Sequence, residues 1–187
     1  MGFIGPEPET VYRSVNGIPL AFLALDAIGG FDLDMAIQGV KSAGEALVVV
    51  AIHWGMEDQF DPSASQQEVA EALADAGATL IWGHHPHVLQ PAEWIHSATA
   101  ETLVLYSLGN ALFDQYGLEV TRPSALVLVT LDASGVKDFR AIPFMIDARE
   151  SRLREAGQAD TQRIMQYFKQ VCATRNECRI MLDENQR

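Results

Sequence analysis

The chain has 187 residues, 48% of them hydrophobic, which is enough for one domain with a substantial core and scarcely enough for two. Its formal net charge is -12, and the acidic excess lies in residues 1–146, whereas residues 147–187 are nearly neutral. Nucleic acids and anionic lipids are bound mainly through Lys and Arg contacts to phosphate. We therefore expect neither as a partner.

No apolar stretch approaches the roughly 20 residues of a membrane-spanning helix, and the N-terminus lacks the basic and apolar regions of a signal peptide. We expect a soluble chain without either feature. The two cysteines, Cys172 and Cys178, allow a disulfide in an oxidising compartment or two thiols in a reducing one. Their spacing favours free thiols, and no third ligand nearby supports a zinc site.

The chain begins with the pattern of a β-hairpin followed by a short amphipathic helix. Asn16-Gly17 lies between two apolar runs within residues 11–25, and this dipeptide favours a type I′ turn. Asp32 then offers an N-cap, and Gly44 offers a stop for a helix with apolar residues at helical spacing.

Strands and a second helix follow. The continuous β-branched run 47–52 is typical of a strand covered on both faces. Ser65 and Glu68 match a capping box for a helix that ends at Gly77. Residues 79–82 and 102–106 predict two further short strands.

The sequence pattern of the last part of the chain predicts a hairpin and then a helical tail. Residues 125–131 and 136–145 flank the turn sequence 132–135. Ile164, Met165, Phe168 and Val171 recur at helical spacing and predict one docked helix. We divide the chain into a mixed α/β domain, residues 1–147, and a C-terminal helical tail, residues 148–187.

The histidines are the strongest functional signal. Residues 82–87, Trp-Gly-His-His-Pro-His, close one apolar strand, and His53 closes another. On an extended backbone His85 and His87 would point to the same side, and His53 from a neighbouring strand end would complete a set of three nitrogen ligands. Neutral imidazoles suit Zn, Fe, Mn, Ni or Cu. We expect His53, His85 and His87 to bind a divalent metal.

Other histidines have competing interpretations. A lone histidine after a strand is more often structural than a ligand, and we assign His96 to that class. His84 is expected to point to the opposite face from His85, where packing, orienting a ligand and touching substrate all remain open. We take His84 as a candidate catalytic residue.

Three polar residues outside the histidine set are further candidates. Glu57, four residues after His53, is a second candidate catalytic residue, as a hydrogen-bond partner of an imidazole. Asn110 offers an amide oxygen for substrate, although a turn residue after Gly109 is an equally simple interpretation. Arg122 is the one arginine of residues 14–139, and binding of an anionic substrate would need it or a metal to offset the acidic surroundings.

Three motifs together resemble the later motifs of a known family. They are His53-Trp54-Gly55-x-Glu57, the run Gly83-His84-His85-Pro86-His87-Val88-Leu89-Gln90-Pro91, and Tyr106-Ser107-Leu108-Gly109-Asn110. In order and separation they are similar to the CapA family of capsule and poly-γ-glutamate synthesis proteins, relatives of the calcineurin-like metallophosphoesterases. The resemblance covers residues 15–146.

The resemblance implies a four-layer α-β-β-α sandwich with mixed sheets and a dinuclear metal centre. His53, His85 and His87 would be metal ligands, with Mn, Fe or Zn as the candidate ions. It also implies a place at the cell envelope, an anionic polymer or phosphoester as substrate, and metal-dependent hydrolysis if the domain is complete.

The chain departs from the family pattern in its earlier half. The Gly-Asp and Asn-His motifs that supply bridging ligands in complete members are missing, so the sequence resembles the C-terminal half of the domain. Three imidazoles can still hold one metal, but two-metal hydrolysis would be lost or much weakened. Uncovered sheet surfaces would favour a homo-oligomer or a partner that supplies the missing half.

Three functions therefore remain open. The first is a CapA-like protein of capsule or poly-γ-glutamate production. The second is a non-catalytic module that binds a metal or a partner. The third is a metal-dependent hydrolase of another phosphoester.

Overall fold

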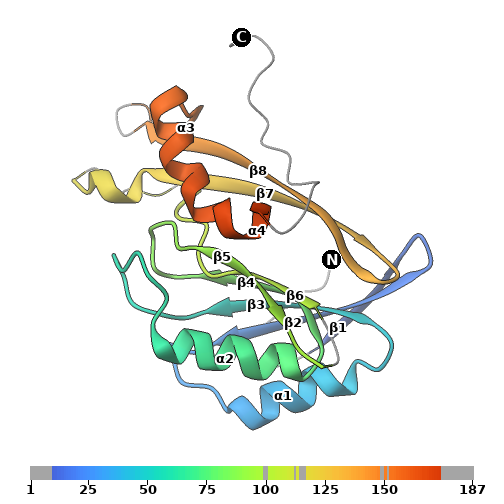
Figure 1. Cartoon of the computed structure of the whole chain (residues 1–187). Helices are drawn as coiled ribbons and strands as arrows, with labels where there is room; N and C mark the ends of the chain where they lie inside the picture. The colour runs from blue at the N-terminus through green and yellow to red at the C-terminus, as the bar shows by residue number, and fades with distance from the viewer. Residues whose placement is uncertain are drawn as a thin grey trace.

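The computed structural model describes residues 10–98, 101–111, 113, 117–147, 150 and 152–173. Most of residues 10–105 form a six-stranded mixed sheet with two helices on one face (Figure 1). Its elements, in chain order, are β1 Val11–Val15, β2 Ile18–Asp26, α1 Leu33–Ser42, β3 Leu47–His53, α2 Ala64–Asp75, β4 Ala78–His84, β5 Ala92–His96 and β6 Glu101–Leu105.

The strand order of this first sheet is β1-β2-β3-β4-β6-β5. Strands β2, β3, β4 and β6 are parallel, whereas β1 and β5 pair antiparallel at the two edges. The carboxyl ends of β2, β3 and β4 therefore lie side by side at one edge of the sheet. Loops that follow parallel strands commonly form binding sites at that edge.

A second, antiparallel sheet packs on the other face of the first (Figure 1). Its order is β7-β8-β9. The elements of this part are the 3-10 turn η1 Glu119–Thr121, β7 Pro123–Asp132, β8 Gly135–Asp147, β9 Arg152–Glu155, α3 Gln158–Met165, the 3-10 turn η2 Gln166–Phe168 and α4 Lys169–Ala173.

Two apolar cores hold these layers together. The first lies between the six-stranded sheet and its helices, and includes Leu23, Val50 and Ile81. The second lies between the two sheets, where Leu103 and Phe139 share a cluster with residues of the C-terminal helices. Alternate residues of β3 and β4 enter opposite cores, as expected of strands buried on both faces.

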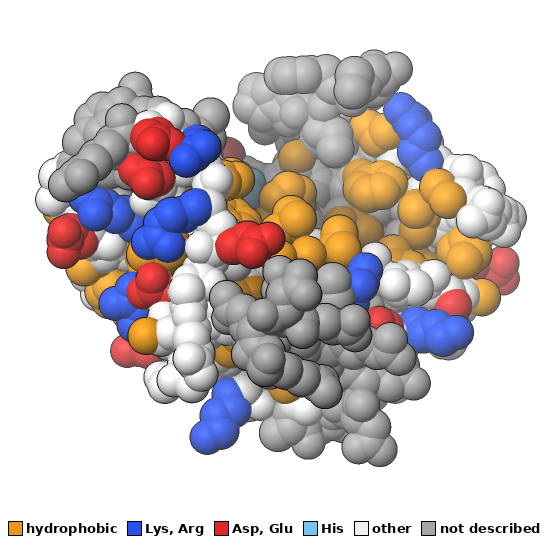
Figure 2. All heavy atoms as spheres, turned by 90° about the horizontal axis from the view of Figure 1, so that it is seen from above, with side chains coloured by type: hydrophobic (Ala, Val, Ile, Leu, Met, Phe, Trp, Pro, Cys, Tyr) orange, Lys and Arg blue, Asp and Glu red, His pale blue; other side chains and the backbone are white. Residues whose placement is uncertain are grey.

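The mixed α/β class and the mixed sheet expected from the sequence are confirmed. Within the described residues the layers are a helix pair and two sheets, as expected for part of a metallophosphatase-like sandwich. The outer face of the second sheet exposes Leu126, Leu128 and Leu153. Hydrophobic side chains also gather on the upper face, where β7 and β8 lie in Figure 1 (Figure 2). Association through uncovered surfaces stays a prediction.

Several local predictions are confirmed. Asn16 and Gly17 have φ angles of 52° and 83°, the left-handed pair that a type I′ turn requires. The Asp32 carboxylate accepts hydrogen bonds from the backbone N–H groups of Asp34 and Met35, so it caps α1. The hairpin of β7 and β8 also forms as expected.

Three local predictions are wrong. The capping box of α2 uses Ser63 and Gln66, two residues earlier than expected. Strand β5 is not expected from the sequence, because Ala92–His96 lacks a clear alternation of apolar and polar residues. Cys172 is disulfide-bonded, so the free-thiol interpretation does not hold, and Cys178 lies outside the described residues.

No helix in the described ranges is both long and apolar enough to cross a membrane. The C-terminal elements α3, η2 and α4 pack against the second core through Ile164, Phe168 and Val171, which are fully buried. The division of the chain at residue 147 stays a prediction.

Gly83 occupies a place in β4 where no side chain fits. A Cβ atom there would lie 2.2 Å from the carbonyl oxygen of Tyr106 and 2.3 Å from Nε1 of Trp54. The Trp54 indole N–H donates a 2.9 Å hydrogen bond to that same carbonyl, and the two aromatic rings stack at 5.4 Å. Both side chains are buried, so they cannot move aside cheaply.

We expect Gly83→Ala to lower the free energy of unfolding by about 3 kcal/mol, the upper end of the usual range for overpacking a core. Urea unfolding measures it. Gly117→Ala is the matched control, because a Cβ at Gly117 meets nothing within 4 Å. Equal stabilities of the two variants would contradict the expectation.

Candidate metal centre

Three polar residues stand in a row at the ends of neighbouring parallel strands. The pairing register places Asp26 beside His53 and His53 beside His84. The Nδ1 atoms of His53 and His84 lie 2.9 Å apart. A hydrogen bond between them would need a proton on one Nδ1 atom and a lone pair on the other.

Four histidine rings form a continuous cluster. The ring centroids are 5.0 Å apart for His84 and His53, 4.5 Å for His53 and His85, and 5.9 Å for His85 and His87. The structure thus brings together all four histidines that the sequence marks as site candidates. His96 ends β5 outside this cluster, and its Nδ1 lies 3.4 Å from Oε1 of Glu101.

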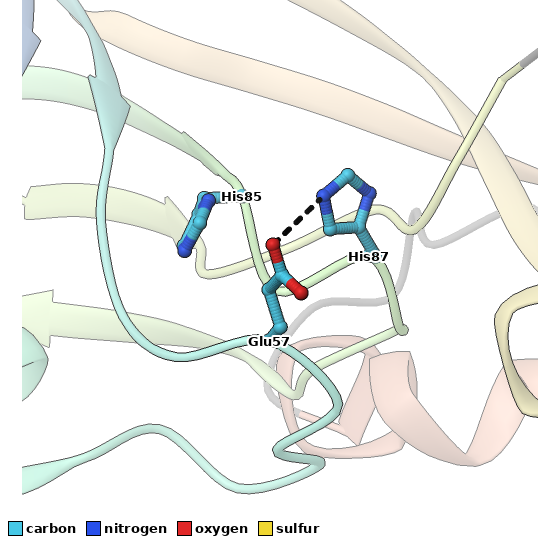
Figure 3. A group of neighbouring side chains, drawn as sticks. All are labelled: Glu57, His85 and His87. Carbon is cyan, nitrogen blue, oxygen red and sulfur yellow. Dashed lines mark ion pairs between the residues drawn. The ribbon is translucent and has the colours of Figure 1, made fainter. Parts of the chain in front are cut away.

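Glu57 lies with His85 and His87 in a group suited to a metal ion. One ligand atom from each side chain lies within 4.8 Å of the others. The Glu57 carboxylate points into the space between the two rings, and its Oε1 is 4.0 Å from Nε2 of His87 (Figure 3). Ligand atoms bound about 2.1 Å from one ion are roughly 3 to 3.5 Å apart, so small rotations would close the site.

The backbone of the histidine loop is not extended, so the geometry assumed from the His-Pro-His spacing is wrong. His85 has a φ angle of 107° and His87 one of 61°, both in the left-handed region that disfavours residues with a Cβ. The two rings nevertheless lie near each other. Such strain persists only where surrounding contacts enforce it, and it is common at functional sites.

A loop from the next strand holds the histidine loop in place. The backbone N–H of Trp54 donates to the carbonyl of His84 at 3.0 Å, and that of Asp58 donates to the carbonyl of Pro86 at 2.9 Å. Both bonds join residues 54–58 to residues 84–86. Glu57, between these two anchors, is therefore brought to the histidines by backbone hydrogen bonds.

Asn110 orients one of the imidazoles. Its Oδ1 lies 2.7 Å from Nδ1 of His87. An amide oxygen can only accept, so His87 donates from Nδ1 and keeps the lone pair on Nε2, the atom that faces Glu57. Histidines that bind metals commonly donate their other ring N–H to an oxygen in this way. Asn110 is only 7% exposed, and its Nδ2 has no partner among the described residues.

Arg122, the other candidate for substrate binding, follows η1. Its guanidinium lies 3.6 Å from the carboxylate of Glu119. A role of Arg122 in substrate binding stays a prediction, as does that of Asn110. The sequence pattern did not distinguish Asp26 from the other acidic residues of the surface. Its position at the end of β2 is the signal that could have singled it out.

Burial and neighbouring charge lower the pKa of two histidines. The pKa of His84 and that of His85 both lie below the ordinary value of 6.5, first because the protein displaces water from the rings and then because His53 would add a like charge. The pKa of the Asp26 carboxyl is also lowered, mainly by the hydrogen bond it accepts from the Gly29 N–H. Neutral imidazoles at neutral pH are the form that binds metals.

A partly open hollow lies beside these loops. Its lining includes Phe60, three residues after Glu57, and Leu89, two residues after His87. Arg163 and Tyr167 of the C-terminal helices form another part of its wall. The hollow is apolar with one cationic group at its side.

Comparison with known proteins identifies the family of the chain. Residues 7–115 match the family model described as "Bacterial capsule synthesis protein PGA_cap", which is more than half of the chain. The chain belongs to this bacterial capsule synthesis family. The matched range contains Glu57, the four clustered histidines and Asn110, whereas Arg122 lies beyond it.

Two curated relatives carry the CapA name, so the resemblance drawn from the motifs is confirmed. The chain is 38% identical over 156 residues to "PGA biosynthesis protein CapA" of Bacillus subtilis (strain 168), covering 75% of this chain and 39% of that protein. It is 37% identical over 156 residues to "Capsule biosynthesis protein CapA" of Bacillus anthracis, covering 73% and 37%. The chain thus spans about two fifths of the length of these family members.

Among solved structures, a hypothetical protein from Thermus thermophilus is similar with a TM-score of 0.49 and 14% sequence identity. The similarity covers 73% of this chain and 61% of that one.

The lowered pKa values predict how the stability of this family member depends on pH without metal. Between the folded pKa of His84 or His85 and 6.5, the unfolded chain binds more protons than the folded one. The free energy of unfolding should therefore fall as the pH is lowered from about 7.5 to 5. Urea unfolding across this range tests it, and His84→Gln combined with His85→Gln should flatten the profile. A flat profile in the wild type would contradict the prediction.

Proposed function

We propose that this chain is the metal-binding part of a protein that acts in capsule or poly-γ-glutamate production at the cell envelope. The observation that carries the proposal is the convergence of Glu57, His85 and His87 in a member of the capsule synthesis family. The names of the curated relatives support the process. The metal site itself rests on the geometry.

The donor set fits a divalent transition metal. Two imidazole nitrogens and a carboxylate suit Zn, Mn or Fe. The His87 ring is held by Asn110 with its lone pair towards Glu57, as a ligand should be. Glu57 is exposed, so the site is open on one side to water or substrate, as catalytic metal sites are and closed structural sites are not.

His53 and His84 extend the site away from Glu57. Their Nδ1 atoms, 2.9 Å apart, are at a distance that two nitrogen ligands of one octahedral ion also reach. His53 contacts His85 as well, so it can serve the same ion or an adjoining one. His84 is the exposed member and can meet substrate.

A metal bound here would act as a Lewis acid towards a phosphoester or another anionic group. The residues around the metal would orient the phosphoester or other anionic group. The acidic surroundings repel anions in general, so only a group that reaches the metal or the Arg163 side of the hollow would be retained. His84, the exposed histidine of the cluster, is the residue that would accept or hold a proton beside it.

A non-catalytic role is the second candidate. It is favoured by the donor set of the described residues, where the one group of Glu57, His85 and His87 suits a single ion. One ion held by the histidines would then stabilise the loops at the strand ends. Both candidate functions involve a bound metal ion. They differ in whether the protein converts a substrate.

We expect one divalent ion per chain to remain after dialysis, and to be lost in His85→Ala and in His87→Ala, because each removes one of three ligands. Elemental analysis measures the content. His96→Ala, which alters a histidine outside the cluster, should bind metal as the wild type does. Wild-type protein without metal would contradict the proposed site.

Hydrolysis separates the two candidate functions. Model phosphodiesters and phosphomonoesters are offered with Mn²⁺ to the wild type and to His85→Ala. We expect the chain by itself to turn them over slowly, yet faster than the variant. Equal rates would exclude the hydrolase function and leave the metal-binding module as the remaining candidate.

A further inference from the structure

Glu57 lies in a loop that has no regular secondary structure, yet its carboxylate must be held opposite two strained histidines. Residues 54–63 connect β3 to α2, and residues 56–60 are exposed to solvent. An exposed loop of this kind would ordinarily sample many conformations. The backbone hydrogen bonds of Trp54 and Asp58 hold its first half, and residues 59–63 need a restraint of their own.

Two glutamine side chains lie buried beneath this loop. Gln66, in the first turn of α2, is 3% exposed, and Gln90, three residues after His87, is 1% exposed. Fully buried amides are uncommon because each must find partners for its donors and its acceptor. These two find them in each other and in the loop.

Their hydrogen bonds form a directed chain. Gln90 donates from Nε2 to the carbonyl oxygens of Gln59 at 2.9 Å and of Asp61 at 3.4 Å. Its Oε1 accepts from Nε2 of Gln66 at 3.1 Å. Oε1 of Gln66 in turn accepts from the Ser63 N–H at 3.0 Å. The loop is therefore bound at both sides of Phe60 and again where α2 begins.

Gln90 is itself anchored to the histidine side of the site. Its backbone N–H donates to the carbonyl of Ser107 at 3.1 Å, and the adjacent Leu89 forms a bridge with Leu108. The side chain thus connects the segment that carries His87 with the loop that carries Glu57. No other side chain type of this length supplies two donors and an acceptor without charge.

The loop also packs tightly on Gln66. Gly55 has a φ angle of 81°, and a Cβ there would lie 2.8 Å from the amide of Gln66. The start of the loop can therefore approach the buried amide only because residue 55 is glycine.

We propose that Gln90, supported by Gln66, is a positioning residue that sets Glu57 opposite His85 and His87. The inference rests on the proposed metal site and deepens it. The affinity for the metal then depends on a buried amide that does not touch the ion. Neither glutamine belongs to the ligand group, and their hydrogen bonds reach the site through the backbone of residues 59–63.

Gln90→Glu tests the proposal with almost no change in volume. A carboxylate still accepts from Gln66, but it repels the carbonyl oxygens of Gln59 and Asp61 and releases the loop. We expect the affinity for Mn²⁺ to fall by roughly 10- to 100-fold, the usual loss when a group that orients a ligand is changed. Electron paramagnetic resonance of free Mn²⁺ during titration measures it. Gln67→Glu, the same change at an exposed position of α2, is the matched control and should bind as the wild type does.

A double-mutant comparison separates positioning from general stability. If Gln90 acts through Glu57, Gln90→Glu should weaken Mn²⁺ binding in the wild type and add nothing in a Glu57→Gln background. The visible spectrum of bound Co²⁺ should change in the same way for Gln90→Glu and for Glu57→Gln. Equal losses in both backgrounds would overturn the inference.

Gln66→Met is the second variant in case Gln90→Glu fails to fold. It removes the support of Gln90 and should weaken Mn²⁺ binding in the same direction, again only while Glu57 is present. If Mn²⁺ binds tightly and through His87, but neither glutamine variant alters that binding, the inference is overturned and the proposed metal site stands. Wild-type protein that binds no Mn²⁺ overturns both.

Discussion

The hydrogen bond from the Trp54 indole to the Tyr106 carbonyl, made across Gly83, fixes the end of the first sheet on which the site is built. Trp54 directly follows His53, Gly83 directly precedes His84, and Tyr106 directly follows β6. One buried contact therefore joins the ends of three strands that already pair in the sheet. The histidines, Asn110 and the loop of Glu57 all begin within a few residues of it, so this contact restrains the segments that carry them.

Around that fixed point the site combines rigid and adjustable parts. His53 and His84 sit on strands, and His85 and His87 on a loop pinned by backbone bonds, whereas Glu57 reaches in from an exposed loop. Side chains on strands are held more accurately than those on loops. The buried glutamines and Asn110 supply, for Glu57 and His87, the restraint that secondary structure supplies for the other ligands.

The sequence predicts most of the fold and the members of the histidine cluster, because turn dipeptides, caps and apolar periodicity are local signals. It does not predict β5, since Ala92–His96 becomes a strand through pairing with β6. It also misses the contact of Asn110 with His87 and that of Gln66 with Gln90, because residues more than twenty positions apart meet only after folding. The positive φ angles at His85 and His87 are likewise imposed by the surrounding loops.

The positive φ angles of His85 and His87 affect the stability of the fold at two positions that hold candidate metal ligands. A residue with a Cβ held in the left-handed region costs of order 1–3 kcal/mol, and glycine would avoid most of that cost. At residue 87 that gain would be offset, because glycine would leave the buried Asn110 amide oxygen without its hydrogen-bond donor. The contacts of the imidazole therefore compensate for the backbone strain that its position imposes.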